Sequence, residues 1–179
     1  MNKRLGRQQW IDAALRALSQ QGVDGVRVER LAEALKVTKG SFYWHFTDRN
    51  ALIEALLEAW KARATGDIIV MVEARGGDAG NRLRTLARTV FNADGRLDRQ
   101  IRAWAANDPM ARAAQDDIDR RRISYLEGLF AELGFSPIEA SARATFIYHA
   151  LIGQFTMGGD GKPKPKQLEI VLRMLVGTN

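Results

Sequence analysis

Between Thr38 and Phe46 the chain gathers side chains that can donate hydrogen bonds or stack on flat rings. The run is Thr38-Lys39-Gly40-Ser41-Phe42-Tyr43-Trp44-His45-Phe46. Lys39 can donate to guanine O6 or N7, Ser41 can donate to a base or a phosphate, and Gly40 allows a close backbone approach. Phe42 and Phe46 are four residues apart, so we expect both to point inward and to leave the polar residues exposed. Such a segment is typical of a short helix that reads DNA.

A helix and a turn must position this run. The preceding segment carries apolar residues at the spacing of one helix face: Val28, Leu31, Ala32 and Leu35. Residues 36–38 then break the pattern, and the Thr38 hydroxyl can cap a second helix. Two short helices joined by a tight turn predict a helix-turn-helix.

The rest of the chain shows helical patterns and no strand pattern. A first helix is expected over about residues 6–21, ended by Gly22, with its apolar face formed by Trp10, Ile11, Ala14, Leu15 and Leu18. A helix capped by Thr47 or Asp48 should continue to about residue 72, before a glycine-rich break at 76–80. Later helices are expected near residues 83–91, 97–105, 109–133, 137–157 and 167–176, with a capping box at Ser136 and Glu139. The sequence predicts an all-α protein.

The amino-acid composition limits the classes of function that are possible. The chain has 179 residues, 46% of them hydrophobic, which is typical of a packed globular protein. The net charge of the chain is +6, and residues 1–50 contribute +4 of it, with nine Lys/Arg and five Asp/Glu. The basic excess therefore lies mainly with the helix-turn-helix, although ordinary scatter also explains it. No cysteine is present, and no apolar run reaches the roughly 20 residues that cross a bilayer. We expect a soluble, cytoplasmic protein with no membrane partner.

The run from Leu31 to Leu52 resembles the DNA-binding region of TetR-type regulators. The resemblance rests on a Gly-Ser-aromatic-Tyr-x-His-Phe pattern at residues 40–46, between a helix that opens in Leu-Ala and the segment Asp48-Arg49-Asn50-Ala51-Leu52. It covers about the first sixty residues. It implies a homodimer with an N-terminal three-helix DNA-binding head at residues 1–47. It also implies a C-terminal helical bundle at residues 48–179 for dimerisation and for a small-molecule effector of unknown identity.

The resemblance also implies which residues contact an operator. Tyr43 and His45 match a phosphate-contacting pair, and Arg49 matches a basic phosphate clamp. Trp44 is expected either to contact a base or sugar or to pack on a neighbouring helix. The predicted DNA-binding set is Arg27, Thr38, Lys39, Gly40, Ser41, Tyr43, Trp44, His45 and Arg49. Lys3, Arg4 and Arg7 form a candidate arm toward a groove, with solution disorder as the alternative.

The sequence departs from the family pattern at two places. Arg27 and Val28 stand where a threonine or serine often caps the first motif helix, so Arg27 is expected to contact a phosphate directly. Lys36 stands where glycine is common in the turn. A left-handed lysine costs about 1 kcal/mol, so we expect mild strain there.

The helical body offers two further sets of candidates. The predicted ligand pocket comprises Arg102, Trp104, Tyr125, Tyr148 and His149, with plain core packing as the alternative. The helix at 137–157 is apolar over most of its circumference, which predicts burial on both flanks and contact with a second subunit. The predicted dimer interface comprises Phe146, Ala150, Leu168, Val171, Leu172 and Leu175. The charges of Asp116–Arg122 favour a solvated helix face over a metal site.

Together these patterns predict a transcriptional regulator, most simply a ligand-responsive repressor that binds a pseudo-palindromic operator as a homodimer. The alternatives are a helical-bundle adaptor that keeps the motif as a protein-binding surface, or an enzyme. Catalysis is disfavoured because the chain has no cysteine and only His45 and His149 as histidines. No cofactor is expected.

Overall fold

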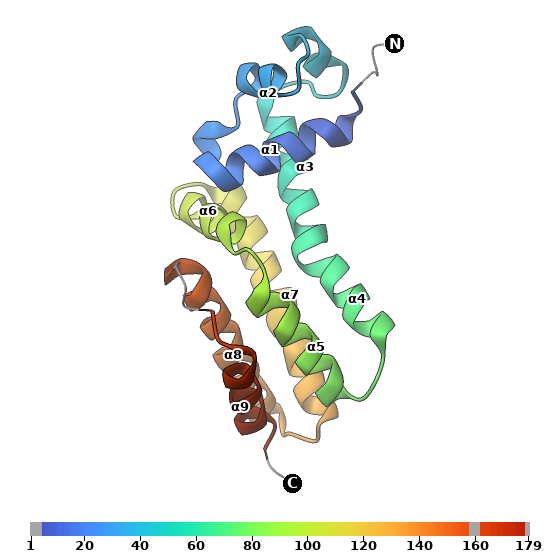
Figure 1. Ribbon diagram of the computed structural model, residues 1–179. Helices are drawn as coiled ribbons and strands as arrows, with labels where there is room; N and C mark the ends of the chain where they lie inside the picture. Colours follow the sequence, from blue (N-terminus) through green and yellow to red (C-terminus); the bar gives the residue numbers. More distant parts are fainter. Residues whose placement is uncertain (1–4, 158–161, 178–179) are drawn as a thin grey trace. The chain divides into compact units, whose positions relative to one another are not determined.

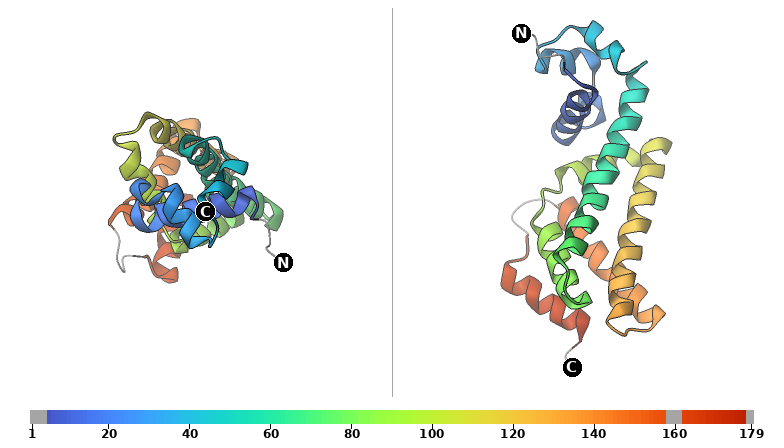
Figure 2. Two further views of the ribbon diagram at one scale, coloured as in Figure 1. Left: turned by 90° about the horizontal axis from the view of Figure 1, so that it is seen from above. Right: turned by 90° about the vertical axis from the view of Figure 1, so that its right-hand side faces the viewer.

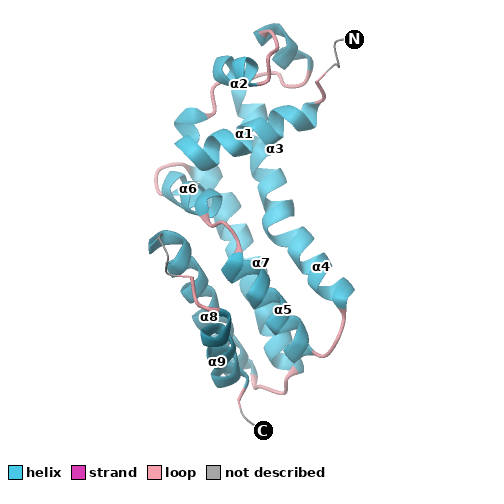
Figure 3. Ribbon diagram, in the orientation of Figure 1, coloured by secondary structure: helices cyan, strands magenta, loops and turns pink. Residues whose placement is uncertain are grey.

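The computed structural model describes residues 5–157 and 162–177, and every regular element in them is a helix (Figures 1 and 3). The all-α prediction is confirmed. None of the helices in these residues combines the length and apolarity needed to span a membrane. The chain divides by packing into two units, Met1–Arg63 with Arg96–Gln115 and Ala64–Gly95 with Asp116–Asn179.

The first unit contains the N-terminal helices and α6. Its elements are α1 (Arg7–Gln21), the 3₁₀ turn η1 (Val23–Gly25), α2 (Val28–Ala34), the 3₁₀ helix η2 (Lys39–Trp44), α3 (Arg49–Lys61) and α6 (Arg96–Ala105). The start of α7 (Pro109–Glu132) also belongs to it. Helix α1 packs against α2, α3 and α6. The first unit therefore extends beyond the predicted domain boundary at residue 47, since α3 and α6 both pack on α1.

Helix α1 buries the face that its sequence predicts. The predicted apolar residues Trp10, Ile11, Ala14, Leu15 and Leu18 are all buried. Gly22 follows α1 with φ 72°, a left-handed conformation that glycine adopts without steric cost. Trp60 of α3 is 1% exposed, and its Nε1 lies 3.4 Å from Oδ2 of Asp98 on α6. The predicted first helix and its end are confirmed.

The second unit contains the helices of the body. Its elements are α4 (Asp67–Arg75), α5 (Ala79–Asn92), the rest of α7, α8 (Pro137–Met157) and α9 (Pro165–Val176). Helix α5 packs against α4, α8 and α9, and the right-hand view of Figure 2 shows α9 beside α5. Leu83, Phe130 and Leu172 are almost completely buried in its core.

Side chains cap these helices where the sequence predicts. Asp48 accepts a hydrogen bond from the Ala51 N–H at 2.8 Å and so caps α3. The Ser136 N–H donates to the Glu139 carboxylate at 3.1 Å, and the Ser136 hydroxyl donates to the same oxygen at 2.7 Å. The predicted capping box before α8 is therefore confirmed.

A π-helical segment, η3 (Ala62–Gly66), interrupts the long helix that the sequence predicts through residue 72. Thr65 within it is 2% exposed. Arg122 of α7 donates from Nε to the Thr65 hydroxyl at 3.0 Å and from a terminal nitrogen to the Ala64 carbonyl at 3.1 Å. An Arg side chain thus satisfies polar groups that the widened turn leaves open.

Among the glycines that the structure describes in the second unit, Gly95 has the least room for a β-carbon. A β-carbon there would lie 2.1 Å from the Cδ1 atom of Phe155, whose side chain is buried. We predict that Gly95→Ala lowers the free energy of unfolding by about 1–3 kcal/mol, the usual cost of overpacking. Gly128→Ala is the control, because its β-carbon meets open space on α7 and should raise stability by up to about 1 kcal/mol. Urea denaturation measures both, and an unchanged Gly95→Ala midpoint would contradict the packing.

Candidate nucleic-acid interface

The segment η2 is a short 3₁₀ helix rather than an α-helix. Thr38 occupies the N-cap position with extended backbone, as predicted, but its hydroxyl makes no capping hydrogen bond. The Thr38 carbonyl instead accepts from the Ser41 N–H at 3.0 Å. Gly40 is exposed, and Ser41 is half-buried. Short 3₁₀ helices have poor hydrogen-bond geometry, so η2 depends on tertiary contacts to keep its shape.

Two phenylalanines provide those contacts. Phe42 is 0% exposed and Phe46 is 4% exposed, which confirms that both point inward. Their rings stack with centroids 5.4 Å apart, and Phe42 also meets Trp10 of α1 edge-on at 5.3 Å. Aromatic pairs in these arrangements stabilise a core beyond their buried area. The segment η2 is therefore held by an aromatic cluster of Trp10, Phe42 and Phe46.

The opposite side of η2 presents aromatic surface to solvent. Tyr43 is 56% exposed and Trp44 is 81% exposed. Exposure of this extent contradicts the alternative that Trp44 packs on a neighbouring helix of the described chain. A free indole ring next to a tyrosine hydroxyl offers one stacking surface and one hydrogen-bond donor to a nucleic acid.

Lys39, at the start of η2, forms an ion pair with Glu29 of α2. The hydrogen bond from Lys39 lowers the pKa of the Glu29 carboxyl, and the same interaction raises the pKa of Lys39. Both groups therefore remain charged at neutral pH. The sequence analysis did not predict this partner for Lys39, because ten residues and a turn separate the two side chains.

The two predicted arginine contacts bind the protein's own backbone in this structure. Arg27 occupies the N-cap position of α2 without a side-chain cap, as expected, and its Nε donates to the Asp24 carbonyl at 3.0 Å. Arg49 donates from Nε to the Val26 carbonyl at 2.7 Å and from a terminal nitrogen to the Val23 carbonyl at 3.0 Å. Arg49 thus ties α3 to the loop before α2, a role that the sequence analysis missed. Phosphate contacts by both arginines stay predictions.

His45 and Arg7 fix the start of the described chain against η2. The Nε2 atom of His45 lies 2.8 Å from the Leu5 carbonyl, and a carbonyl only accepts, so Nε2 carries the proton. The Arg7 guanidinium lies over the Phe46 ring at 4.8 Å. Arg7 therefore packs on the head, while Lys3 and Arg4 of the predicted arm lie outside the described residues.

The turn between α2 and η2 is strained as the sequence predicts. Lys36 has φ 56°, and it is the one non-glycine residue with positive φ in residues 5–157 and 162–177. Left-handed backbone at a residue with a β-carbon costs about 1–2 kcal/mol.

The five predicted pocket residues are divided between the two units. Arg102 and Trp104 belong to the first unit, and the other three belong to the second. The Tyr125 hydroxyl donates to Glu73, and the Tyr148 hydroxyl donates to Asp119 at 2.6 Å. Burial, together with the bond to Glu73, raises the pKa of Tyr125. Both tyrosine hydroxyls therefore have internal partners.

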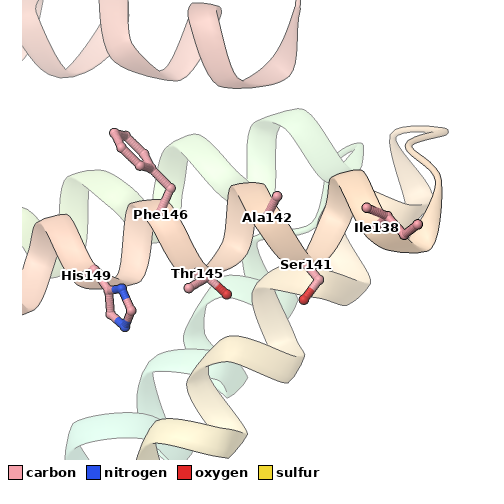
Figure 4. Close-up of a pocket in the computed structure, with 6 residues that line it drawn as sticks. All are labelled: Ile138, Ser141, Ala142, Thr145, Phe146 and His149. Atoms are coloured by element: carbon pink, nitrogen blue, oxygen red, sulfur yellow. The ribbon is translucent and has the colours of Figure 1, made fainter.

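His149, the fifth of these residues, lines an open groove on α8. The groove has a volume of about 570 Å³, and its lining residues are Ile138, Ser141, Ala142, Thr145, Phe146 and His149. Figure 4 shows Ala142 and Phe146 on one side of α8, with Ser141 and His149 pointing to the other. All six residues come from one helix, so the groove does not enclose a ligand.

The predicted dimer residues divide into two groups. Leu168 and Leu172 are 5% and 1% exposed in the core of the second unit, so they cannot form the interface as predicted. Helical spacing predicted their apolar character correctly, but it could not distinguish core from interface. Phe146, Ala150 and Val171 are exposed, and Leu175 is half-buried. The described α8 and α9 expose further large apolar side chains: Ile138, Met157, Ile170 and Met174.

Comparison with known proteins places this head among regulators. Residues 11–56 match the family described as bacterial regulatory proteins, tetR family. The head is thus similar to the DNA-binding region of that family, and the match leaves the rest of the chain outside it. It is 48% identical over 52 residues to the tetracycline repressor protein class A from transposon 1721 of Escherichia coli, which covers 29% of this chain. The match spans only 24% of the length of that repressor, so the TetR-type resemblance in sequence is limited to the head.

Solved structures extend the similarity in fold to nearly the whole chain. Reduced NemR of E. coli has a TM-score of 0.77 at 21% identity, with 94% of this chain and 95% of that chain covered. AibR, in complex with isovaleryl coenzyme A and operator DNA, has a TM-score of 0.72 at 17% identity, with 97% and 98% covered. At such identities the comparison shows a shared fold alone.

Replacing Lys36 by glycine should relieve the strain in the turn. We predict that Lys36→Gly raises the free energy of unfolding by roughly 1 kcal/mol, because glycine adopts positive φ without a steric penalty. Lys36→Ala removes the same charge but keeps the β-carbon, so it should bring no comparable gain. Thermal denaturation of both variants tests this, and equal midpoints for the two would show that backbone strain is not the cause.

Proposed function

We propose that this protein is a transcriptional regulator that binds a pseudo-palindromic DNA operator as a homodimer and is released by a small-molecule effector. The observation that carries the proposal is the exposed face of η2, with Tyr43 and Trp44 in solvent above the buried Phe42 and Phe46. The TetR-family head supports it. The proposal places the protein in the cytoplasm and assigns it regulation rather than catalysis.

The head presents the chemistry that a major-groove contact requires. Lys39 and Ser41 stand at the N-terminal end of η2, the end that enters the groove in helix-turn-helix proteins. Tyr43 adds a donor for a phosphate oxygen, and such contacts set the register of a protein on the duplex. The aromatic cluster fixes these groups before binding, so little order has to be gained on the DNA.

Exposed apolar residues of α8 and α9 support the homodimer. Phe146 is 64% exposed and Ile138 is 84% exposed on α8, while Met174 is 76% exposed on α9. Large apolar side chains gathered on adjacent surfaces mark interaction sites in soluble proteins. A two-fold axis through this surface brings the same residues of both copies together.

The proposal assigns the effector to the fold without naming a single binding site. The structure of AibR holds both a coenzyme A ester and operator DNA, which shows that this fold accommodates a ligand and DNA in that protein. In this chain, an effector acts if it binds better to the conformations that do not fit the operator. The internal bonds of Tyr125 and Tyr148 make both residues candidates for rearrangement on binding, because a ligand with a polar group can replace Glu73 or Asp119 as partner.

Truncating Tyr43 should weaken DNA binding. We predict that Tyr43→Ala costs about 1.5–3 kcal/mol per head, the range for a hydrogen bond to a charged group. Tyr43→Phe, which removes only the hydroxyl, should lose most of the same energy. Fluorescence anisotropy with a duplex selected by the wild-type protein from genomic fragments measures both at one salt concentration. Unchanged affinity of Tyr43→Ala would contradict the proposed docking, and an unchanged sedimentation coefficient controls for dimerisation.

A charge on the exposed face of α8 should separate the subunits. We predict that Phe146→Glu is a folded monomer, because two carboxylates would meet across the two-fold axis in a buried apolar contact. Val70→Glu on α4 is the control, since Val70 is 68% exposed and lies outside the proposed interface. Sedimentation velocity distinguishes the species. A dimeric Phe146→Glu, or a monomeric wild-type protein, would refute this interface.

The adaptor alternative makes a different prediction for salt. Duplex DNA binding that depends on Lys and Arg releases counterions and therefore weakens steeply as salt rises. A protein-binding surface would bind a selected duplex no more tightly than a random one, because a net charge of +6 attracts any duplex regardless of its sequence. Titration of wild-type protein with a selected and a random duplex over a salt series thus decides between regulator and adaptor.

A further inference from the structure

Glu29 places a carboxylate on the surface that is proposed to meet DNA. Glu29 lies in the first turn of α2, and its Oε1 accepts a hydrogen bond from Nζ of Lys39 at the first position of η2. Both side chains are more than half exposed, at 63% for Glu29 and 52% for Lys39. The pair therefore links the two helices of the helix-turn-helix on its solvent side.

Folding of the head does not explain this pair. Exposed ion pairs contribute little to stability, because water screens them and ordering two long side chains costs entropy. The segment η2 is already anchored by Phe42 and Phe46 in the core. An acidic group on this surface would also be repelled by the phosphate backbone of DNA, so its presence there requires another explanation.

Neighbouring charges place the pair among the proposed contacts. Lys39 interacts electrostatically with Tyr43, and Glu29 interacts with Arg27. The Arg30 guanidinium, next to Glu29 in the chain, donates to Gln21 at 3.2 Å. Within the part of the chain that the structure describes, Lys39 is the cation that hydrogen-bonds to Glu29, and any DNA group that takes Lys39 must compete with that carboxylate.

We propose that Glu29 is a specificity-determining residue, which holds Lys39 in the unbound head and releases it only to a G·C base pair. The inference rests on the proposed function. A phosphate oxygen can satisfy Lys39, but it leaves the Glu29 carboxylate unpaired beside a polyanion. In the major groove of a G·C pair, guanine O6 and N7 accept from Lys39 while the cytosine N4 amino group donates to Glu29. Both charged groups are then satisfied together, which random contacts with the backbone cannot achieve.

Comparison of Glu29→Gln with Glu33→Gln tests the proposal. Glu33 is exposed on the same helix, so its replacement removes the same charge and leaves the Glu29–Lys39 pair intact. The probes are a random-sequence duplex and a duplex selected by the wild-type protein from a random pool. Glu29→Gln should bind the random duplex more tightly, because Lys39 becomes available to phosphates. The slope of the logarithm of the binding constant against the logarithm of the salt concentration should become more negative by about 0.9 per head. Its ratio of selected to random affinity should fall about tenfold, whereas Glu33→Gln should keep the wild-type ratio.

A double variant shows whether Glu29 acts through Lys39. If it does, Lys39→Gln and the double variant Glu29→Gln/Lys39→Gln should have the same salt dependence, and additive effects would overturn the inference. Equal affinity ratios for Glu29→Gln and Glu33→Gln would overturn it while DNA binding itself stands. A lowered thermal midpoint of Glu29→Gln with an unchanged ratio would make the pair a structural brace instead. Absence of wild-type binding to either duplex would overturn the proposed function as well.

Discussion

The contact of Phe42 with Trp10 and Phe46 is the constraint on which the head depends. A six-residue 3₁₀ helix has few hydrogen bonds of its own and is not stable alone. Burying Phe42 completely between α1 and Phe46 determines which residues of η2 face solvent. Everything proposed for Lys39, Tyr43 and Trp44 follows from that orientation. Loss of the aromatic cluster would therefore affect the proposed DNA contacts, which the cluster does not itself make.

Local patterns predicted those parts of the structure that local physics determines. Gly22 ends α1, Ser136 and Glu139 cap α8, and Lys36 takes a left-handed backbone, because each depends on residues within one or two turns. The inward direction of Phe42 and Phe46 followed from their spacing. These features needed no knowledge of distant partners, so one sequence was sufficient.

Features that depend on distant partners escaped prediction. The π-helical turn at Ala62–Gly66 is matched by Arg122, nearly sixty residues later in the chain. Nothing in the sequence around Arg49 indicates that its guanidinium donates to carbonyls more than twenty residues earlier. The burial of Leu168 and Leu172 likewise depends on how α9 packs on α5, which periodicity alone cannot determine. Side-chain chemistry was visible in each case, but the choice of partner was not.

Lys36 joins backbone conformation to charge at a single position. Its left-handed φ uses part of a folding free energy that is only about 5–15 kcal/mol in most domains. The same residue places a cation three positions before η2, in a head with few acidic groups. Glycine would fit this backbone better and would carry no charge, so stability and attraction for a polyanion cannot both be greatest at this turn. Under the proposed function, the strained turn lowers the stability of the head and in exchange adds electrostatic attraction between Lys36 and DNA phosphates.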